Sequence, residues 1–191
     1  MLFRSSGSGY QSVDVQNYEL KTDYKFFAAP KLDKDVFLVG RISGWEDYNL
    51  MSGQANIFYD GKYTGKSFID VGKSSDTLDL SLGRDNGIVV NRTKIKEFTQ
   101  NQIIGINKKE TVGISISIRN TKDIPVKVNL MDQIPVSANA SIEVELLEIS
   151  GATHDLTNGY LNWEVQLEPA ETMNYVIKYA VKYPKNLKIN L

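Results

Sequence analysis

Few side chains in this sequence are suited to acid–base or nucleophilic chemistry. The chain contains no Cys and a single His, His154. Thiol nucleophiles, disulfides, cysteine-based zinc sites and multi-histidine metal sites are therefore excluded. His154 lies in a predicted loop, and no Gly-x-Ser-x-Gly elbow supplies a nucleophile for it to activate. We predict no catalytic residues, no metal and no cofactor, and hence no enzymatic activity.

Two further patterns in the sequence are typical of sites of chemistry. The segment Asp60–Ser67 ends in the Gly-Lys-Ser of a phosphate-binding loop, but Asp60 stands where the first Gly belongs. The residues after it continue as a strand instead of a helix, so a hairpin turn is the favoured interpretation. The 23 Asp and Glu residues leave an acid-dependent hydrolase open, because sequence alone cannot show which carboxylates approach each other in a cleft.

The candidate binding residues lie in one aromatic and acidic loop, after Gly44. They are Trp45, Glu46, Asp47 and Tyr48. Loop aromatics beside acids can stack on a sugar or anchor a partner protein, and sugar stacking requires both rings to be exposed on one groove. The favoured alternative is that Trp45 closes the open end of a core, with Tyr48 beside it.

The elements that must position these residues are strands, because apolar residues recur with a period of two. Leu78 to Leu82, Ile114 to Ile118 and Leu161 to Leu167 each alternate apolar and polar side chains. Such runs bury one face and leave the other in water. The sequence therefore predicts an all-β protein of one or two antiparallel, immunoglobulin-like β-sandwich modules. Further strands are expected near 13–20, 24–29, 36–42, 55–59, 63–69, 88–98, 126–131, 142–149 and 172–183.

Turn residues divide the chain into two predicted modules. Asp60-Gly61, Asn86-Gly87 and Asn158-Gly159 are typical of two-residue hairpin turns. The polar, glycine-rich break at 83–87 suggests a boundary between an N-terminal β module (11–84) and a C-terminal β-sandwich module (85–191). Residues 1–10 are expected to form a flexible lead-in, and the start of the chain to be the cut end of a longer protein.

Charge and hydropathy narrow the classes of partner. The formal charge is −1, with the two signs interspersed, which argues against a nucleic-acid partner. No apolar run approaches the roughly 18–20 residues of a membrane span. These features leave a protein or a carbohydrate as the expected kinds of partner.

Several motifs in the second half resemble those of one family. The run Asp132-Gln133-Ile134-Pro135-Val136-Ser137 is similar to the D-Q-I-P-V-S signature of mucoidy inhibitor A-like bacterial proteins. The segment Gly159–Trp163 resembles their G-x-L-x-W strand, and the end at Val181–Lys185 resembles their closing Y-P-K. In the first half, Leu50–Gly53 resembles L-x-P-G, with Ser52 where Pro is usual.

The resemblance implies a C-terminal domain of unknown function in exported bacterial proteins, carried behind an N-terminal domain and a coiled coil. It implies a cell-envelope location, periplasmic or surface-exposed, and a first module with an uncovered strand edge where upstream strands are absent. The family supplies no accepted catalytic residues. The leading hypothesis is a non-catalytic structural or protein-interaction module that binds a protein partner or self-associates, and the alternative is a carbohydrate-binding β-sandwich module.

Overall fold

The computed structural model describes residues 16–59, 61–72, 76–98 and 100–189 of the chain. These residues form strands and two single turns of 3-10 helix, so the predicted all-β class is confirmed. The predicted lead-in at 1–10 lies outside the described residues. The elements are β1 (Thr22–Ala28), β2 (Val36–Ser43), η1 (Glu46–Tyr48), β3 (Gly53–Tyr59), β4 (Lys62–Ile69), β5 (Thr77–Asp85), β6 (Ile88–Lys94), η2 (Lys96–Phe98), β7 (Gln100–Ile104), β8 (Asn107–Asn120), β9 (Val126–Gln133), β10 (Glu143–Glu148), β11 (Thr153–His154), β12 (Tyr160–Leu167) and β13 (Thr172–Pro184).

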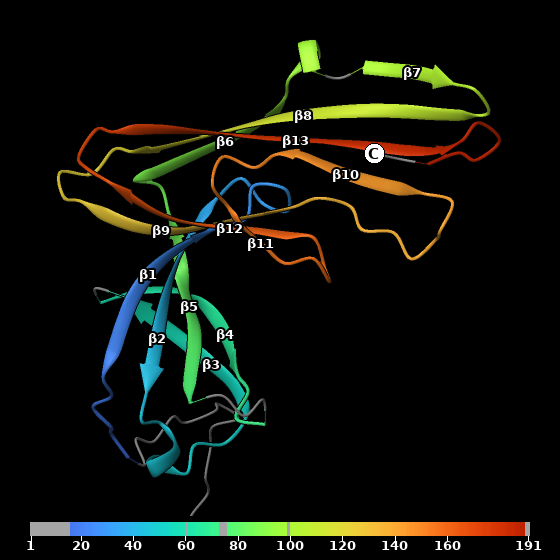
Figure 1. Cartoon of the computed structure of the whole chain (residues 1–191). Coiled ribbons are helices and arrows are strands. Elements are labelled where there is room, and N and C mark those ends of the chain that lie inside the picture. The colour runs from blue at the N-terminus through green and yellow to red at the C-terminus, as the bar shows by residue number, and fades with distance from the viewer. Residues whose placement is uncertain (1–15, 60, 73–75, 99, 190–191) are drawn as a thin grey trace, which may run out of the picture.

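Two sheets pack face to face to form a β-sandwich. One sheet has the strand order β10-β13-β8-β6, with β7 also paired to β8. The facing sheet has the order β11-β12-β9-β1-β2-β5. Only β11, β12 and β9 face the first sheet along their length. Figure 1 shows β1, β2 and β5 leaving the sandwich to form a second part together with the hairpin β3–β4. One continuous sheet therefore joins the two parts of the molecule.

The sandwich core follows directly from the alternating runs. Along β9, the residues Val126, Val128, Leu130 and Asp132 are buried, while the residues between them are exposed or half-buried. The long strands β8, β12 and β13 bury one face in the same way. Because successive strand side chains point to opposite faces, these buried positions meet between the sheets.

A smaller core holds the second part together. Trp45, Leu78 and Leu80 are buried in one cluster, with the half-buried side chains of Ile42 and Leu50 packed against them. Leu78 and Leu80 come from the alternating run on β5, as the sequence predicted. This cluster is separate from the sandwich core, which instead includes Ala28 of β1 and Val36 of β2.

The prediction of a hairpin at Asn86-Gly87 is wrong. β5 and β6 flank this turn but belong to different sheets, so the chain crosses here from one sheet to the other. The Gly87 N–H donates to Asp85 Oδ1 at 2.9 Å, and the Gly87 carbonyl accepts from the Thr121 N–H at 2.8 Å. A Cβ on Gly87 would lie 2.8 Å from the Lys122 side chain, so a larger residue at this corner would require Lys122 to shift.

Other differences from the predicted strands concern short or irregular segments. β7 and the two-residue β11 were not predicted, and the predicted strand 88–98 ends at Lys94, before the turn η2. β1 pairs with β9 in parallel, where antiparallel pairing was expected. The strand predicted at 13–20 falls partly outside the described residues, and Gln16–Leu20 is not a strand. The hairpin at Asp60-Gly61 is supported by the pairing of Tyr59 with Lys62, although Asp60 itself is not described.

Candidate functional site

The loop of Trp45 does not present the two exposed rings that sugar stacking requires. Trp45 precedes η1 and is only 9% exposed, within the small core. Glu46 and Asp47 are exposed, while the ring of Tyr48 packs edge-on against Tyr18 at 4.7 Å between centroids. Because Trp45 is buried, the hypothesis that a sugar stacks on its ring is wrong. The role of the loop in binding a partner protein stays a prediction.

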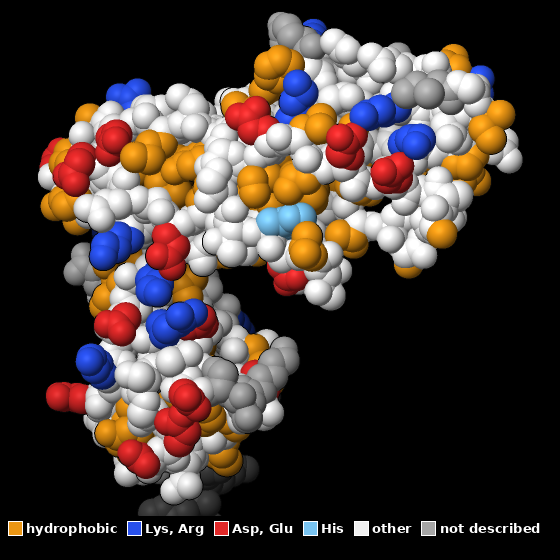
Figure 2. All heavy atoms as spheres, in the orientation of Figure 1, with side chains coloured by type: hydrophobic (Ala, Val, Ile, Leu, Met, Phe, Trp, Pro, Cys, Tyr) orange, Lys and Arg blue, Asp and Glu red, His pale blue; other side chains and the backbone are white. Residues whose placement is uncertain are grey.

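An apolar groove opens instead at one edge of the sandwich. It has a volume of about 330 Å³ and lies between the segment that follows β9, the edge strand β10 and the edge strand β11. Figure 2 shows orange, hydrophobic side chains gathered beside the only histidine of the chain, drawn in pale blue. The groove is lined by Ile134, Pro135, Val136, Ser137, Ile142, Val144, Leu146, His154 and Leu156.

The first wall of the groove is the Ile134–Ser137 segment, which leaves β9 after Gln133. The Ile134 N–H donates to the Gly159 carbonyl at 3.0 Å, and Pro135 has no N–H to donate. Gly159 has φ +75°, and a Cβ there would lie 2.3 Å from the Ile134 carbonyl oxygen, so this approach requires glycine. Beyond it, Val136 is 52% exposed at the rim.

The second wall is built from the strand β10 and the turn before it. β10 pairs with β13 on one side, and within the described residues no strand pairs with its other side. Its alternation turns Val144 and Leu146 inward, where both pack against the sandwich core. The result is a free strand edge beside an apolar surface, which is the arrangement that accepts an added strand.

His154 supplies the polar atom of the groove. The sequence placed it in a loop, but the structure places it on β11, paired with Leu161 of β12. Its Nε2 atom is buried and has no hydrogen-bond partner among the described residues. The nearby Ser137 hydroxyl is bonded within its own turn, to the carbonyl and N–H of Asn139. The groove therefore offers mainly apolar contact, and no activated nucleophile lies among its described residues.

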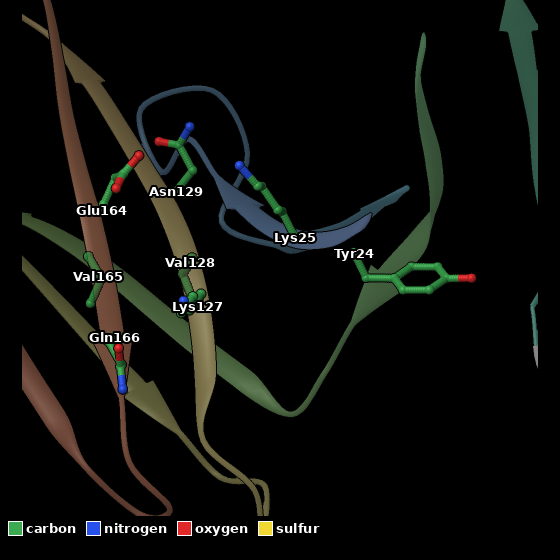
Figure 3. Close-up of a pocket in the computed structure, with 8 residues that line it drawn as sticks. All are labelled: Tyr24, Lys25, Lys127, Val128, Asn129, Glu164, Val165 and Gln166. Atoms are coloured by element: carbon green, nitrogen blue, oxygen red, sulfur yellow. The ribbon is translucent and has the colours of Figure 1, made fainter. Parts of the chain in front are cut away.

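A second hollow, of about 370 Å³, lies on the outer face of the six-stranded sheet. It forms where β1 diverges from β9, because the two strands pair only from Phe26 to Ala28 of β1. Figure 3 shows Glu164, Asn129 and Lys25 pointing toward one another, with the Tyr24 ring turned away. These side chains are exposed and solvated, so this hollow offers less binding energy than the apolar groove.

The buried polar residue Asn120 has a structural role. Its side-chain amide donates to the carbonyls of Ile124 at 2.8 Å and Glu168 at 3.1 Å, and its Oδ1 accepts from the Lys122 N–H at 3.0 Å. Every strong hydrogen-bonding atom of this side chain is thereby used inside the protein. Asn120 ties the β8–β9 turn to the β12–β13 turn and is not available to a ligand.

A second buried polar group joins the two sheets of the sandwich. Arg92 on β6 donates from Nε to Asp132 Oδ2 on β9 at 2.7 Å, and the Asp132 side chain is fully buried. Burial raises the pKa of the nearby Tyr179 phenol; the charge of Arg92 opposes this rise and that of Asp132 adds to it. Asp132 Oδ1 also accepts a hydrogen bond from the Gln133 N–H at 2.7 Å.

Neither a metal cluster nor a membrane-spanning helix is found in the part of the chain that the structure describes. No group of three or more His, Cys, Asp or Glu residues there could hold a metal ion. None of the described helical turns is long and apolar enough to cross a bilayer.

Comparison with known proteins identifies the class of domain. The profile of a domain of unknown function, DUF4139, matches residues 7–185, so the chain belongs to this family. It is similar to protein F37C4.5 of Caenorhabditis elegans, with 26% identity over 187 residues, 91% of this chain and 34% of that protein. The chain thus spans about a third of the length of this curated relative, and similar chains occur in an animal.

Among solved structures, the chain aligns with the folded domain of LppM from Mycobacterium tuberculosis. The sequence identity is 10%, the alignment covers 93% of this chain and 98% of that one, and the TM-score is 0.24.

Proposed function

We propose that this domain is a non-catalytic protein-interaction module of a cell-envelope protein of the mucoidy inhibitor A-like kind. Its ligand is an extended, apolar segment of a partner polypeptide, held in the groove between β10 and β11. The observation that carries the proposal is this apolar groove at an open edge of the sandwich, beside a strand edge without a described partner. The motif resemblance supplies the envelope part of the proposal.

The apolar rim of the groove favours a binding role over a purely structural one. Leu156 is 82% exposed and Val136 is 52% exposed, and both line the hollow. Burying a side chain of this size contributes about 2 kcal/mol, and clustered apolar side chains at a surface hollow mark interaction sites.

The free edge of β10 favours an extended ligand. A strand added to this edge would complete the backbone hydrogen bonds of β10 and turn alternate side chains toward Val144 and Leu146. The outward carboxylates Glu143 and Glu145 already pair with Lys182 and Lys109, at 3.3 and 2.7 Å. The ligand is therefore chosen by apolar side chains at alternate positions instead of by its charge.

Photo-crosslinking in the full-length protein, expressed in its own cells, tests the proposal. A photoreactive amino acid is placed at Val136 or Leu156 in the groove, and at Val89 as the control. Val89 is 51% exposed on β6, which makes it a close match for Val136. We expect a discrete protein adduct at both groove positions and none at Val89.

The matched substitutions Val136→Asp and Val89→Asp give the second readout. Capture of the crosslinked partner should fall at least about tenfold with Val136→Asp and stay unchanged with Val89→Asp, because a buried carboxylate opposes docking. Equal labelling at all three positions, no adduct, or an adduct that is a second copy of this chain would each overturn the proposal of a heterologous partner.

A further inference from the structure

The turn between β7 and β8 carries exposed apolar side chains at the end of the sandwich. Ile103 is 72% exposed and Ile106 is 82% exposed, on either side of Gly105, which has φ +59°. Figure 1 shows this turn at the far end of the long layer formed by β8 and β13. The turn shares no residue with the lining of the groove or of the polar hollow, so it is a separate surface.

The chain around this turn is rich in lysine. Residues 100–109 and 184–189 contain Lys108, Lys109, Lys185 and Lys188 and no Asp or Glu. The Lys185 N–H donates to the Ile106 carbonyl at 3.1 Å, which holds the segment after β13 beside the tip.

Two of these lysines have charges that are not neutralised. Lys108 donates to Glu110, and Lys109 donates to Glu145 at 2.7 Å. Lys185 and Lys188 are exposed and make no ion pair with the described residues. The end of the sandwich therefore combines a protruding apolar tip with a local excess of positive charge.

We propose that this end of the domain docks on an anionic membrane surface. Ile103 and Ile106 enter the boundary between headgroups and acyl chains, while Lys185 and Lys188 lie against the lipid phosphates. Apolar side chains flanked by lysines are matched to this interface, where the apolar part leaves water and each cation is attracted by the negative surface potential. Docking at the tip leaves the groove between β10 and β11 open to its own ligand.

A single fluorescent label tests the proposal, because the chain has no Cys. The variant Ile106→Cys is labelled with an environment-sensitive fluorophore, and Ile124→Cys serves as the control. Ile124 is 62% exposed and lies in the β8–β9 turn. With vesicles of phosphatidylcholine and phosphatidylglycerol, we expect a blue shift at position 106 that salt reverses, and no shift at 124.

Co-sedimentation of the unlabelled chain with the same vesicles supplies the second measurement. Ile103→Ser with Ile106→Ser, or Lys185→Gln with Lys188→Gln, should each weaken binding about tenfold or more, whereas Ile124→Ser should not change it. Equal binding to phosphatidylcholine alone, no shift, or the same shift at both positions would overturn the proposal. A shift at position 106 that grows with protein concentration in the absence of vesicles would assign the tip to a second copy of the chain.

Discussion

At the scale of single residues, the ion pair between Arg92 on β6 and Asp132 on β9 links the two sheets of the sandwich. Asp132 shares the inward face of β9 with Val128 and Leu130, so the strand pattern itself carries this carboxylate into the core. A buried carboxylate is tolerated only where a cation and hydrogen-bond donors surround it. Arg92 and the Gln133 N–H supply both, which explains an acidic residue at an inward position.

Replacing Asp132 by Ala should destabilise the protein by about 3 kcal/mol, because Arg92 is left without its buried partner. The control is Asp79→Ala, since Arg41 holds Asp79 at 2.7 Å but both side chains are more than 40% exposed. The hydrogen bond from Arg41 lowers the pKa of Asp79, yet solvent screening limits the loss there to about 1 kcal/mol or less. Urea unfolding measures both, and similar losses would contradict the bridging role of Asp132.

At the scale of elements, β13 contributes a row of tyrosines to the sandwich. Tyr175, Tyr179 and Tyr183 lie four residues apart on the face of β13 that turns toward the core. Burial is the largest cause of the raised pKa of each of these three phenols. The strand therefore packs best while its tyrosines carry no charge.

The raised pKa of Tyr179 predicts a loss of stability in alkali. The unfolded chain ionises its tyrosines near pH 10, while the folded chain keeps Tyr179 protonated to higher pH. Its contribution is thus fully present below about pH 10 and is lost as the pH rises through the raised folded value. The urea concentration at the midpoint of unfolding should fall less at alkaline pH in Tyr179→Phe than in the unchanged protein. Tyr63→Phe, at a residue that is 54% exposed, should not alter this fall. An unchanged alkaline fall in Tyr179→Phe would refute this account.

At the scale of the whole molecule, the six-stranded sheet couples the two parts. β1 and β2 belong to the second part along most of their length, yet Ala28 and Val36 are buried in the sandwich core. β1 also covers one edge of β9 by pairing from Val128 to Leu130. The sandwich therefore depends on residues that precede the predicted boundary at 84/85.

A chain of residues 85–191 should be less stable than a chain of residues 16–191. It loses Ala28 and Val36 from its core and uncovers the edge of β9, which favours pairing with other molecules. We expect a lower melting temperature by circular dichroism and larger species by light scattering. If residues 85–191 melt like the longer chain and stay monomeric, the predicted two-module division holds instead.

The strands and their buried faces can be recognised from the sequence, because side-chain direction alternates within one strand whatever its partners are. Residues 78–82, 114–118 and 161–167 show this alternation and form strands, and Trp163 within the last run is buried. The strands β7 and β11 were missed because Gln100–Ile104 does not alternate apolar and polar residues and β11 has only two residues.

Which strands pair, and which side chains from separate segments meet, depends on how the whole chain folds. Asn86-Gly87 signals a sharp turn, but whether the next strand pairs with β5 or crosses to the other sheet depends on hydrogen-bond partners far along the chain. The groove follows the same rule, since Ile134, Val144 and His154 come from three separate segments. The burial of Trp45 was likewise decided by packing against Leu78 and Leu80, because exposure is set by distant neighbours.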